Sequence, residues 1–133
     1  MIKLQHRFMR DEENLILPWE KRPTSAIVVK EYPDLPLDNK VVGIAIAEIN
    51  GVYPSKDQWS RNKEVDMWYL CVEGKGKIQF SSGEIYRLEK DVLLHIQKNQ
   101  CYRVSGNLKV VIITIPPWYP KQYEWVRSEN NQF

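Results

Sequence analysis

Histidine and cysteine are both scarce in this sequence of 133 residues, which has two of each. The two cysteines, Cys71 and Cys101, form no CxxC pair, and residues 1–30 contain no hydrophobic segment of a secretory signal. These absences predict a reduced, cytoplasmic protein rather than a disulfide-stabilised secreted one. With only His6 and His95, one copy of the chain cannot build a three-histidine site, and the spacing of Cys71, Cys101 and His95 does not support a zinc site, so we expect no metal and no cofactor.

Long apolar runs and blocks of one charge are also missing. The longest apolar runs, AIVV and VVIITI, are strand-sized, whereas a membrane-spanning helix needs about 20 residues. Nineteen basic and 17 acidic residues are spread along the chain, for a formal net charge of +2. We therefore expect neither a membrane nor a nucleic-acid partner. The composition, 43% hydrophobic and 27% charged, is typical of a globular protein, and this length predicts one domain over residues 1–133.

The hydrophobic pattern predicts many short strands. Residues 2–9 alternate between apolar and polar side chains, and the β-branched segments 25–32 and 41–49 end at proline, LDN and NG. Turn-like clusters separate the further strands predicted at 66–73, 76–80, 84–88, 91–96, 101–105 and 108–115. Because no helical period lies between them, the sequence predicts an antiparallel sandwich or barrel. The tail YPKQYEWVRSEN fits a short helix or an extended arm equally well.

Two segments resemble the sequence motifs of the cupin family. DMWYLCVEGKGKIQF is similar to the first motif, in which two histidines and a glutamate precede a strand that ends in a Gly-x-Gly turn. GEIYRLEKDVLLHIQKNQCYRVSG is similar to the second motif, which supplies a third histidine, and VVIITIPPWYP resembles the closing strand and its exit. The resemblance implies an all-β jelly-roll barrel. Its motif core would span about 41–117, between an N-terminal strand at 2–9 and an aromatic tail at 118–133.

The family's metal-ligand positions carry other residues here. Aligned on Gly74, the glutamate falls at Met67, and the third histidine falls at Tyr102 or, with a register slip, at Cys101. The first two histidines fall at Ser60 and Asn62, or at Arg61 and Lys63 if the loop is one residue shorter. A thioether is a poor substitute for a carboxylate on a hard divalent ion. The resemblance therefore implies a metal-independent protein rather than a metal-dependent dioxygenase.

Several side chains are candidates for a ligand site. Met67, Tyr69 and Cys71 share one strand face, which the resemblance turns into the barrel; core packing accounts for Met67 and Cys71, whereas a buried tyrosine needs a hydrogen-bond partner. The proposed ligand contacts are Arg61, Lys63, Met67, Tyr69 and Tyr102. The aromatic tail, with Trp118, Tyr119, Tyr123 and Trp125, suits an interface, a lid over the barrel mouth, or simple packing on its own domain.

Three functions remain open on the sequence. The leading hypothesis is a metal-independent cupin-like protein that binds a small polar or anionic, sugar-like metabolite in the barrel. The second is a metal-independent isomerase, epimerase or lyase, with Tyr102 as acid and His95, Glu64 or Asp66 as base. The third is an interaction or structural protein whose barrel is filled by side chains. We also expect a homodimer, formed through the N-terminal strand or a sheet edge, since open jelly rolls must cover exposed edges.

Overall fold

The computed structural model of the protein describes residues 15–32 and 41–128. Its strands are β1 (Trp19–Thr24), β2 (Ile27–Tyr32), β3 (Gly43–Tyr53), β4 (Gln58–Asn62), β5 (Asp66–Phe80), β6 (Ile85–Glu89), β7 (Leu93–Ile96), β8 (Cys101–Ile115) and β9 (Tyr123–Arg127), with one 3-10 turn, η2 (Pro120–Gln122), before β9. The all-β fold predicted from the sequence is confirmed. The strand predicted at residues 2–9 lies outside the described residues. Within 15–32 and 41–128, no helix is long and apolar enough to cross a lipid bilayer.

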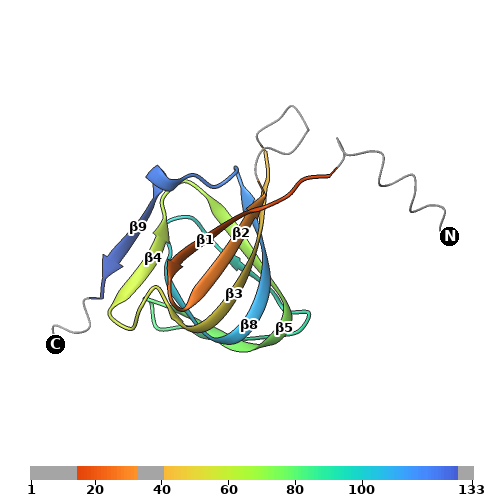
Figure 1. The fold of residues 1–133 in the computed structure, drawn as a ribbon. Coiled ribbons are helices and arrows are strands. Elements are labelled where there is room, and N and C mark those ends of the chain that lie inside the picture. The colour runs from red at the N-terminus through yellow and green to blue at the C-terminus, as the bar shows by residue number, and fades with distance from the viewer. Residues whose placement is uncertain (1–14, 33–40, 129–133) are drawn as a thin grey trace.

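The strands pair in one antiparallel sheet that curls into a barrel-like wall (Figure 1). β8 lies at its centre, because it pairs with β5 along one side and with β3 and then β4 along the other. β1 and β2 extend the sheet beyond β3, whereas β9 extends it beyond β4. The first and last described strands therefore both lie on the side of β8 away from β5, whereas β6 and β7 pair with β5 on the other side.

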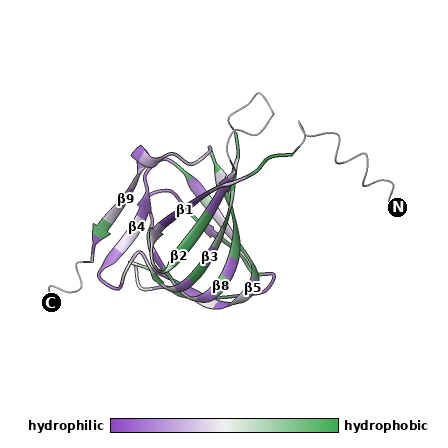
Figure 2. Ribbon diagram, viewed as in Figure 1, coloured by the Kyte–Doolittle hydropathy of each residue, from purple (hydrophilic) through white to green (hydrophobic). Residues whose placement is uncertain are grey.

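Alternation along the central strands gives the sheet two different faces. On β5, Met67, Tyr69 and Cys71 are 5%, 2% and 0% exposed, and they lie opposite Thr114, Ile112 and Val110 of β8. Because directly paired residues project to the same side of a sheet, these side chains together form the inner wall. The predicted inward face of Met67, Tyr69 and Cys71 is thus present. Figure 2 shows hydrophobic residues along β2, β3, β8 and β5, with hydrophilic ones between them.

β5 and β8 are each one long strand of 15 residues, where the sequence predicted two short strands in each segment. The segments EGKG and SGN, expected to be turns, instead pair with each other in the antiparallel ladder, with Gly76 opposite Gly106. A Cβ on Gly106 would lie 2.5 Å from the Gly76 Cα, so these glycines allow close backbone contact rather than a reversal of direction. An irregularity between Cys71 and Glu73 also moves the inward side chains of β5 from odd to even positions.

The segment before the first motif and the aromatic tail pair with each other. Residues 58–62, which the sequence placed at the start of the loop before the first motif strand, form β4, which pairs over its full length with β9. The tail was expected to be a short helix or an arm, and it forms the three-residue turn η2 followed by a strand. Pro120 fits the first position of such a turn, and the alternating residues that follow it suit a sheet edge.

Candidate binding site in the barrel

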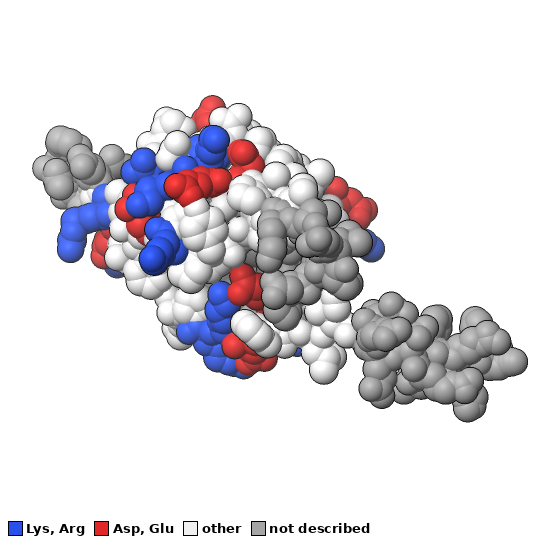
Figure 3. Space-filling model, turned by 90° about the horizontal axis from the view of Figure 1, so that it is seen from above, with Lys and Arg blue, Asp and Glu red and all other residues white. Residues whose placement is uncertain are grey.

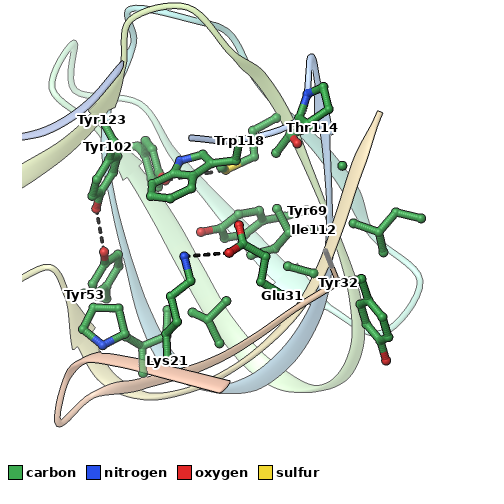
Figure 4. Close-up of a pocket in the computed structure, with 18 of the residues that line it drawn as sticks. Lys21, Glu31, Tyr32, Tyr53, Tyr69, Tyr102, Ile112, Thr114, Trp118 and Tyr123 are labelled. Carbon is green, nitrogen blue, oxygen red and sulfur yellow. Dashed lines mark hydrogen bonds and ion pairs between the residues drawn. The ribbon is translucent and has the colours of Figure 1, made fainter. Parts of the chain in front are cut away.

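A cavity of about 260 Å³ opens into the curled sheet (Figure 4). Its walls come from β1, β2, β3, β5 and β8 and from the tail segment that carries Trp118, Tyr123 and Trp125. Apolar side chains such as Val29, Ala45 and Ile112 form most of the lining. The remaining wall carries a limited set of polar groups, whose placement determines what the cavity can bind.

The four positions aligned with the family's metal ligands lie together, and two of them, Met67 and Tyr102, line this cavity. Ser60, Asn62, Met67 and Tyr102 are 0%, 1%, 5% and 2% exposed. Ser60 and Tyr102 are neighbours across β4 and β8, and the Tyr102 hydroxyl donates to the Met67 sulfur at 3.6 Å. The Asn62 amide nitrogen also lies 4.0 Å from that sulfur. Among the described residues, no group of three or more His, Cys, Asp or Glu side chains is arranged to hold a metal ion.

The Asn62 side chain holds the tail through hydrogen bonds to Trp118 and Gln122. Its side-chain oxygen accepts a hydrogen bond from the Trp118 indole at 3.0 Å and from the Gln122 amide at 2.8 Å. Gln122 is 2% exposed, and its own side-chain oxygen accepts from the backbone N–H of Glu64 at 3.2 Å. These buried polar groups therefore satisfy one another, and Asn62 belongs to an amide network that joins β4 to the tail. That network holds Trp118 against the cavity.

A chain of hydroxyl groups lies on one side of the cavity. The Tyr123 hydroxyl is 2.6 Å from the Tyr53 hydroxyl and 2.6 Å from the Ser60 hydroxyl, and it accepts the indole N–H of Trp125 at 2.9 Å. Figure 4 shows Tyr53 and Tyr123 facing each other at this wall. The cluster joins β3, β4 and β9, so it also ties the tail strand to the barrel.

Burial keeps the phenols of this site protonated. It is the main cause that raises the pKa of Tyr53, Tyr69, Tyr102 and Tyr123. For Tyr53, the hydrogen bonds of Tyr123, Trp125 and Ser60 partly offset the rise in pKa. The pKa of Tyr102 is raised further by the neighbouring Tyr69, whose ring meets it edge-to-face at a centroid distance of 6.2 Å. Neutral phenols at physiological pH act as hydrogen-bond donors, so the site offers donors rather than negative charge.

An ion pair stands at the front of the cavity. The Lys21 ammonium lies 2.7 Å from the Glu31 carboxylate and 4.6 Å from the centre of the Trp118 ring. Both side chains line the cavity and are partly exposed, at 38% and 25%. Their charges cancel, so the lining carries no uncompensated charge within the described residues. On the face shown in Figure 3, basic and acidic side chains likewise lie beside one another.

Thr114 is a polar residue of the cavity lining whose hydroxyl has no hydrogen-bond partner among the described residues. Thr114 is 4% exposed. Gly43 lies opposite it on β3, and a Cβ at that position would come within 2.6 Å of the Thr114 oxygen. A side chain at position 43 would therefore clash with this hydroxyl, and glycine avoids the clash. In Figure 4, Thr114 lies across the cavity from Tyr53 and Tyr123.

The structure brings together three of the five predicted ligand contacts. Met67, Tyr69 and Tyr102 line the cavity. Arg61 and Lys63 are not among the described residues that line it; their cationic groups lie 3.1 and 4.0 Å from Glu124. Alternation along β4 explains the difference, because Ser60 and Asn62 project inward and the residues between and after them project outward.

His95 lies on the outer face of the sheet. It pairs with Trp68 across β5 and β7, and its ring stacks on the indole at a centroid distance of 4.4 Å. Its Nε2 is 3.1 Å from the Asp66 carboxylate. Because Trp68 alternates with the inward Met67 and Tyr69, the structure does not bring His95 or Asp66 to Tyr102. Glu64, the other predicted base, is an exposed residue at the start of the loop before β5.

Four polar residues of the site were not selected from the sequence. They are Lys21, Glu31, Tyr53 and Thr114. A signal for three of them was present, because Glu31 continues the alternation of Ile27 and Val29, Thr114 that of Val110 and Ile112, and Tyr53 that of Ala47 and Ile49. Each is thus assigned to the inner face by its strand. Lys21 had no such signal, since β1 itself was not predicted.

The curled all-β sheet around an internal cavity is a cupin-type barrel, as the sequence motifs indicated. No protein-family model matches the sequence, and no curated protein sequence matches it. Solved structures do match its fold. Pac13 of Streptomyces, described as a nucleoside dehydratase, has a TM-score of 0.71 at 14% identity, over 84% of this chain and 86% of its own. Variants of Pac13 have been solved with uridine, at the same TM-score and identity.

Two further solved structures share the fold. Ectoine synthase from P. lautus has a TM-score of 0.62 at 15% identity, over 79% of each chain. KdgF from Halomonas sp. has a TM-score of 0.59 at 12% identity, over 75% of this chain and 87% of its own. At these identities the similarity shows the fold alone.

Proposed function

We propose that this protein binds a small, uncharged, polar molecule of nucleoside or sugar type in the barrel cavity. The observation that carries the proposal is the cavity itself, about 260 Å³ of space with an apolar wall and a few neutral hydrogen-bonding groups. Met67, Tyr69 and Tyr102 would contact the ligand, together with Tyr53 and Thr114. The uridine complexes of Pac13, a protein of similar fold, support this ligand class.

Charge balance favours an uncharged ligand over an anionic one. The cation that lines the cavity, Lys21, is already paired with Glu31. An anion would have to compete with that carboxylate, and it would lose water without gaining a free cation. The polar half of the sequence-based hypothesis is therefore kept, and the anionic half is less well supported.

Calorimetric titration of the purified protein tests the proposal. Uridine, its fragments uracil and D-ribose, and uridine monophosphate form a suitable panel. We expect uridine to bind, and the monophosphate to bind at least about tenfold more weakly because of its unpaired charge. Tighter binding of the monophosphate would instead favour the anionic class.

A pair of variants locates the binding site. Ala45→Phe fills the cavity, whereas Ile46→Phe adds the same side chain at the next residue, on the opposite face of β3. Ala45→Phe should abolish binding and Ile46→Phe should leave it unchanged. Equal binding by both variants would remove the cavity as the binding site.

A second candidate function is a metal-independent isomerase, epimerase or lyase. One observation favours it: the Glu31 carboxylate and the neutral Tyr102 phenol line the same cavity, as a base and an acid for proton transfer. Proton abstraction would show as solvent deuterium incorporated into a bound compound, followed by NMR. Glu31→Gln should abolish the incorporation, while Asp66→Asn, on the outer face, should not.

We also propose that the protein is a cytoplasmic homodimer. Its two cysteines are free thiols, which supports a reducing compartment. Apolar side chains exposed on the outer face of β3, β7 and β8, namely Ile44, Leu93 and Ile115, support a partner surface for a second copy.

A further inference from the structure

We infer that the cavity presents two directed hydrogen-bonding groups to its ligand, the Tyr53 hydroxyl as a donor on one wall and the Thr114 hydroxyl on the opposite wall (Figure 4). The ligand class that fits is an uncharged molecule with an acceptor atom at one end, a second polar atom at the other, and a planar or apolar middle. This inference rests on the proposed function and specifies its site further.

The direction of the hydroxyl chain follows from its donors. The indole N–H of Trp125 can only donate, so it uses one lone pair of the Tyr123 oxygen. Ser60 is 0% exposed, and its hydroxyl lies 2.6 Å from the Tyr123 hydroxyl. A buried hydroxyl that does not donate leaves its proton unpaired at a cost of about 1–3 kcal/mol, so Ser60 donates to Tyr123. Both lone pairs of Tyr123 are then occupied.

The remaining proton of the chain belongs to Tyr53. With both lone pairs occupied, Tyr123 has one proton, and the oxygen within its reach is that of Tyr53 at 2.6 Å. Tyr53 therefore accepts from Tyr123 and keeps its own proton for a further partner. Because Tyr53 lines the cavity, that proton is available to an acceptor atom of a ligand. Three donors in series polarise the last one, so Tyr53 becomes a stronger donor than an isolated phenol.

Thr114 provides the second contact. Its oxygen is one of three buried side-chain polar atoms that have no hydrogen-bond partner among the described residues, and it is the one of the three that belongs to a residue lining the cavity. Gly43, opposite Thr114 on β3, carries no Cβ that would clash with this oxygen, and Thr114 is among the residues that line the cavity. A ligand that satisfies this hydroxyl removes an existing desolvation penalty, so the contact discriminates strongly against a molecule with an apolar group at that end.

The middle of the cavity separates the two polar ends. Tyr69 of β5 and Ile112 of β8 are paired and project to the same side of the sheet. In Figure 4 they lie between Thr114 and the Tyr53–Tyr123 wall. An aromatic ring and a branched aliphatic side chain suit a flat ring stacked or packed between the polar ends. Uridine, with carbonyl acceptors on its base and hydroxyl groups on its sugar, has this distribution of groups.

Urea denaturation of the ligand-free protein tests the hydrogen-bond assignment. Thr114→Val should be no less stable than wild type, because it removes a hydroxyl that has no partner in the protein. Tyr123→Phe should lower the denaturation midpoint clearly, since Ser60 and Trp125 lose their acceptor. Tyr53→Phe should lower the midpoint less, because Tyr53 is the last member of the chain of hydroxyl groups and only Tyr123 loses an acceptor. Tyr86→Phe, an exposed tyrosine on β6, is the matched control. Destabilisation by Thr114→Val, or equal losses for Tyr53→Phe and Tyr123→Phe, would overturn the inference.

Calorimetric titration with uridine tests the contacts themselves. Tyr53→Phe and Thr114→Val should each raise the dissociation constant about three- to tenfold, and Tyr86→Phe should leave it unchanged. If uridine binds wild type and both cavity variants equally, the inference is overturned while the proposed function stands. If wild type binds neither uridine nor its fragments, the proposed function fails for this class, and the urea measurements decide the hydrogen-bond assignment on their own.

Discussion

At the scale of single residues, the four aligned metal-ligand positions show how a barrel can change its chemistry without changing its shape. Ser60, Asn62, Met67 and Tyr102 occupy neighbouring inward positions, but their atoms contact one another and the tail. The residue identities were readable in the sequence, and so was the inward direction of Met67 and Tyr102. Their partners were not, because Gln122 and Trp118 reach them only after the chain returns from a distant segment.

The buried phenols make stability depend on pH in the alkaline range. Tyr53, Tyr69, Tyr102 and Tyr123 have a raised pKa in the folded protein, whereas tyrosines of the unfolded chain titrate with a pKa near 10. The folded state thus holds these protons more tightly. The stability this contributes is complete below about pH 10 and is lost as the pH rises above it. We expect the urea midpoint to be level between about pH 7 and 9 and to fall beyond pH 10.

Tyrosinate absorbance gives an independent measurement of the same effect. These four phenols, of which Tyr123 is partly buried and the others buried, should ionise together with unfolding, detected by circular dichroism, and Tyr102→Phe should reduce that late absorbance change by one phenol. Ionisation of all tyrosines near pH 10 with the circular dichroism unchanged would contradict the assignment.

At the scale of elements, the close pairing of β5 and β8 depends on glycine. Gly106 has a φ of +131°, and a Cβ there would lie 2.5 Å from the Gly76 Cα and from the Lys75 carbonyl oxygen. Gly106→Ala therefore combines a strained backbone with a clash against another backbone, and we expect it to cost more than about 2 kcal/mol of unfolding free energy. Chemical denaturation measures the loss.

Gly83→Ala is the matched control for that substitution. Gly83 also has a positive φ, of +107°, but a Cβ there would meet no atom within 4 Å. The unfolding free energy lost in Gly83→Ala should reflect backbone strain alone, and it should be smaller than the loss in Gly106→Ala. Equal losses would show that the contact between β5 and β8 does not depend on the missing side chain at position 106.

Local sequence signals identified most strand segments and missed the pairings between distant ones. Strands β2, β3, β6 and β7 and the long segments of β5 and β8 follow patterns of β-branched and alternating residues. EGKG and SGN were interpreted as turns because glycine, serine and asparagine are common in turns. Glycine also occurs inside strands where two backbones approach closely, and no local pattern distinguishes the two cases. β4 and β9 are short polar segments that become strands because β4 pairs with both β8 and β9, so their sequences alone gave no indication.

At the scale of the whole molecule, the outer face of the sheet bears on assembly. Leu93 is 58% exposed on β7, opposite Leu70 of β5. If a second copy covers this face, size-exclusion chromatography with light scattering should give twice the chain mass of 15.8 kDa. Leu93→Glu should shift the protein toward the monomer, and Ile85→Glu, an equally exposed site on β6, should not. A monomeric wild type at micromolar concentration would rule out the dimer.

The cavity is completed by β9, the last strand of the described sheet, and this has a consequence for synthesis on the ribosome. Tyr123 and Trp125 leave the exit tunnel after the other strands that the structure describes, although they pair with β4 and line the cavity. A nascent chain can curl its central strands early, but it has no finished pocket until translation has passed these residues. A small molecule that binds there can therefore protect the completed protein from degradation, and it cannot assist the growing chain.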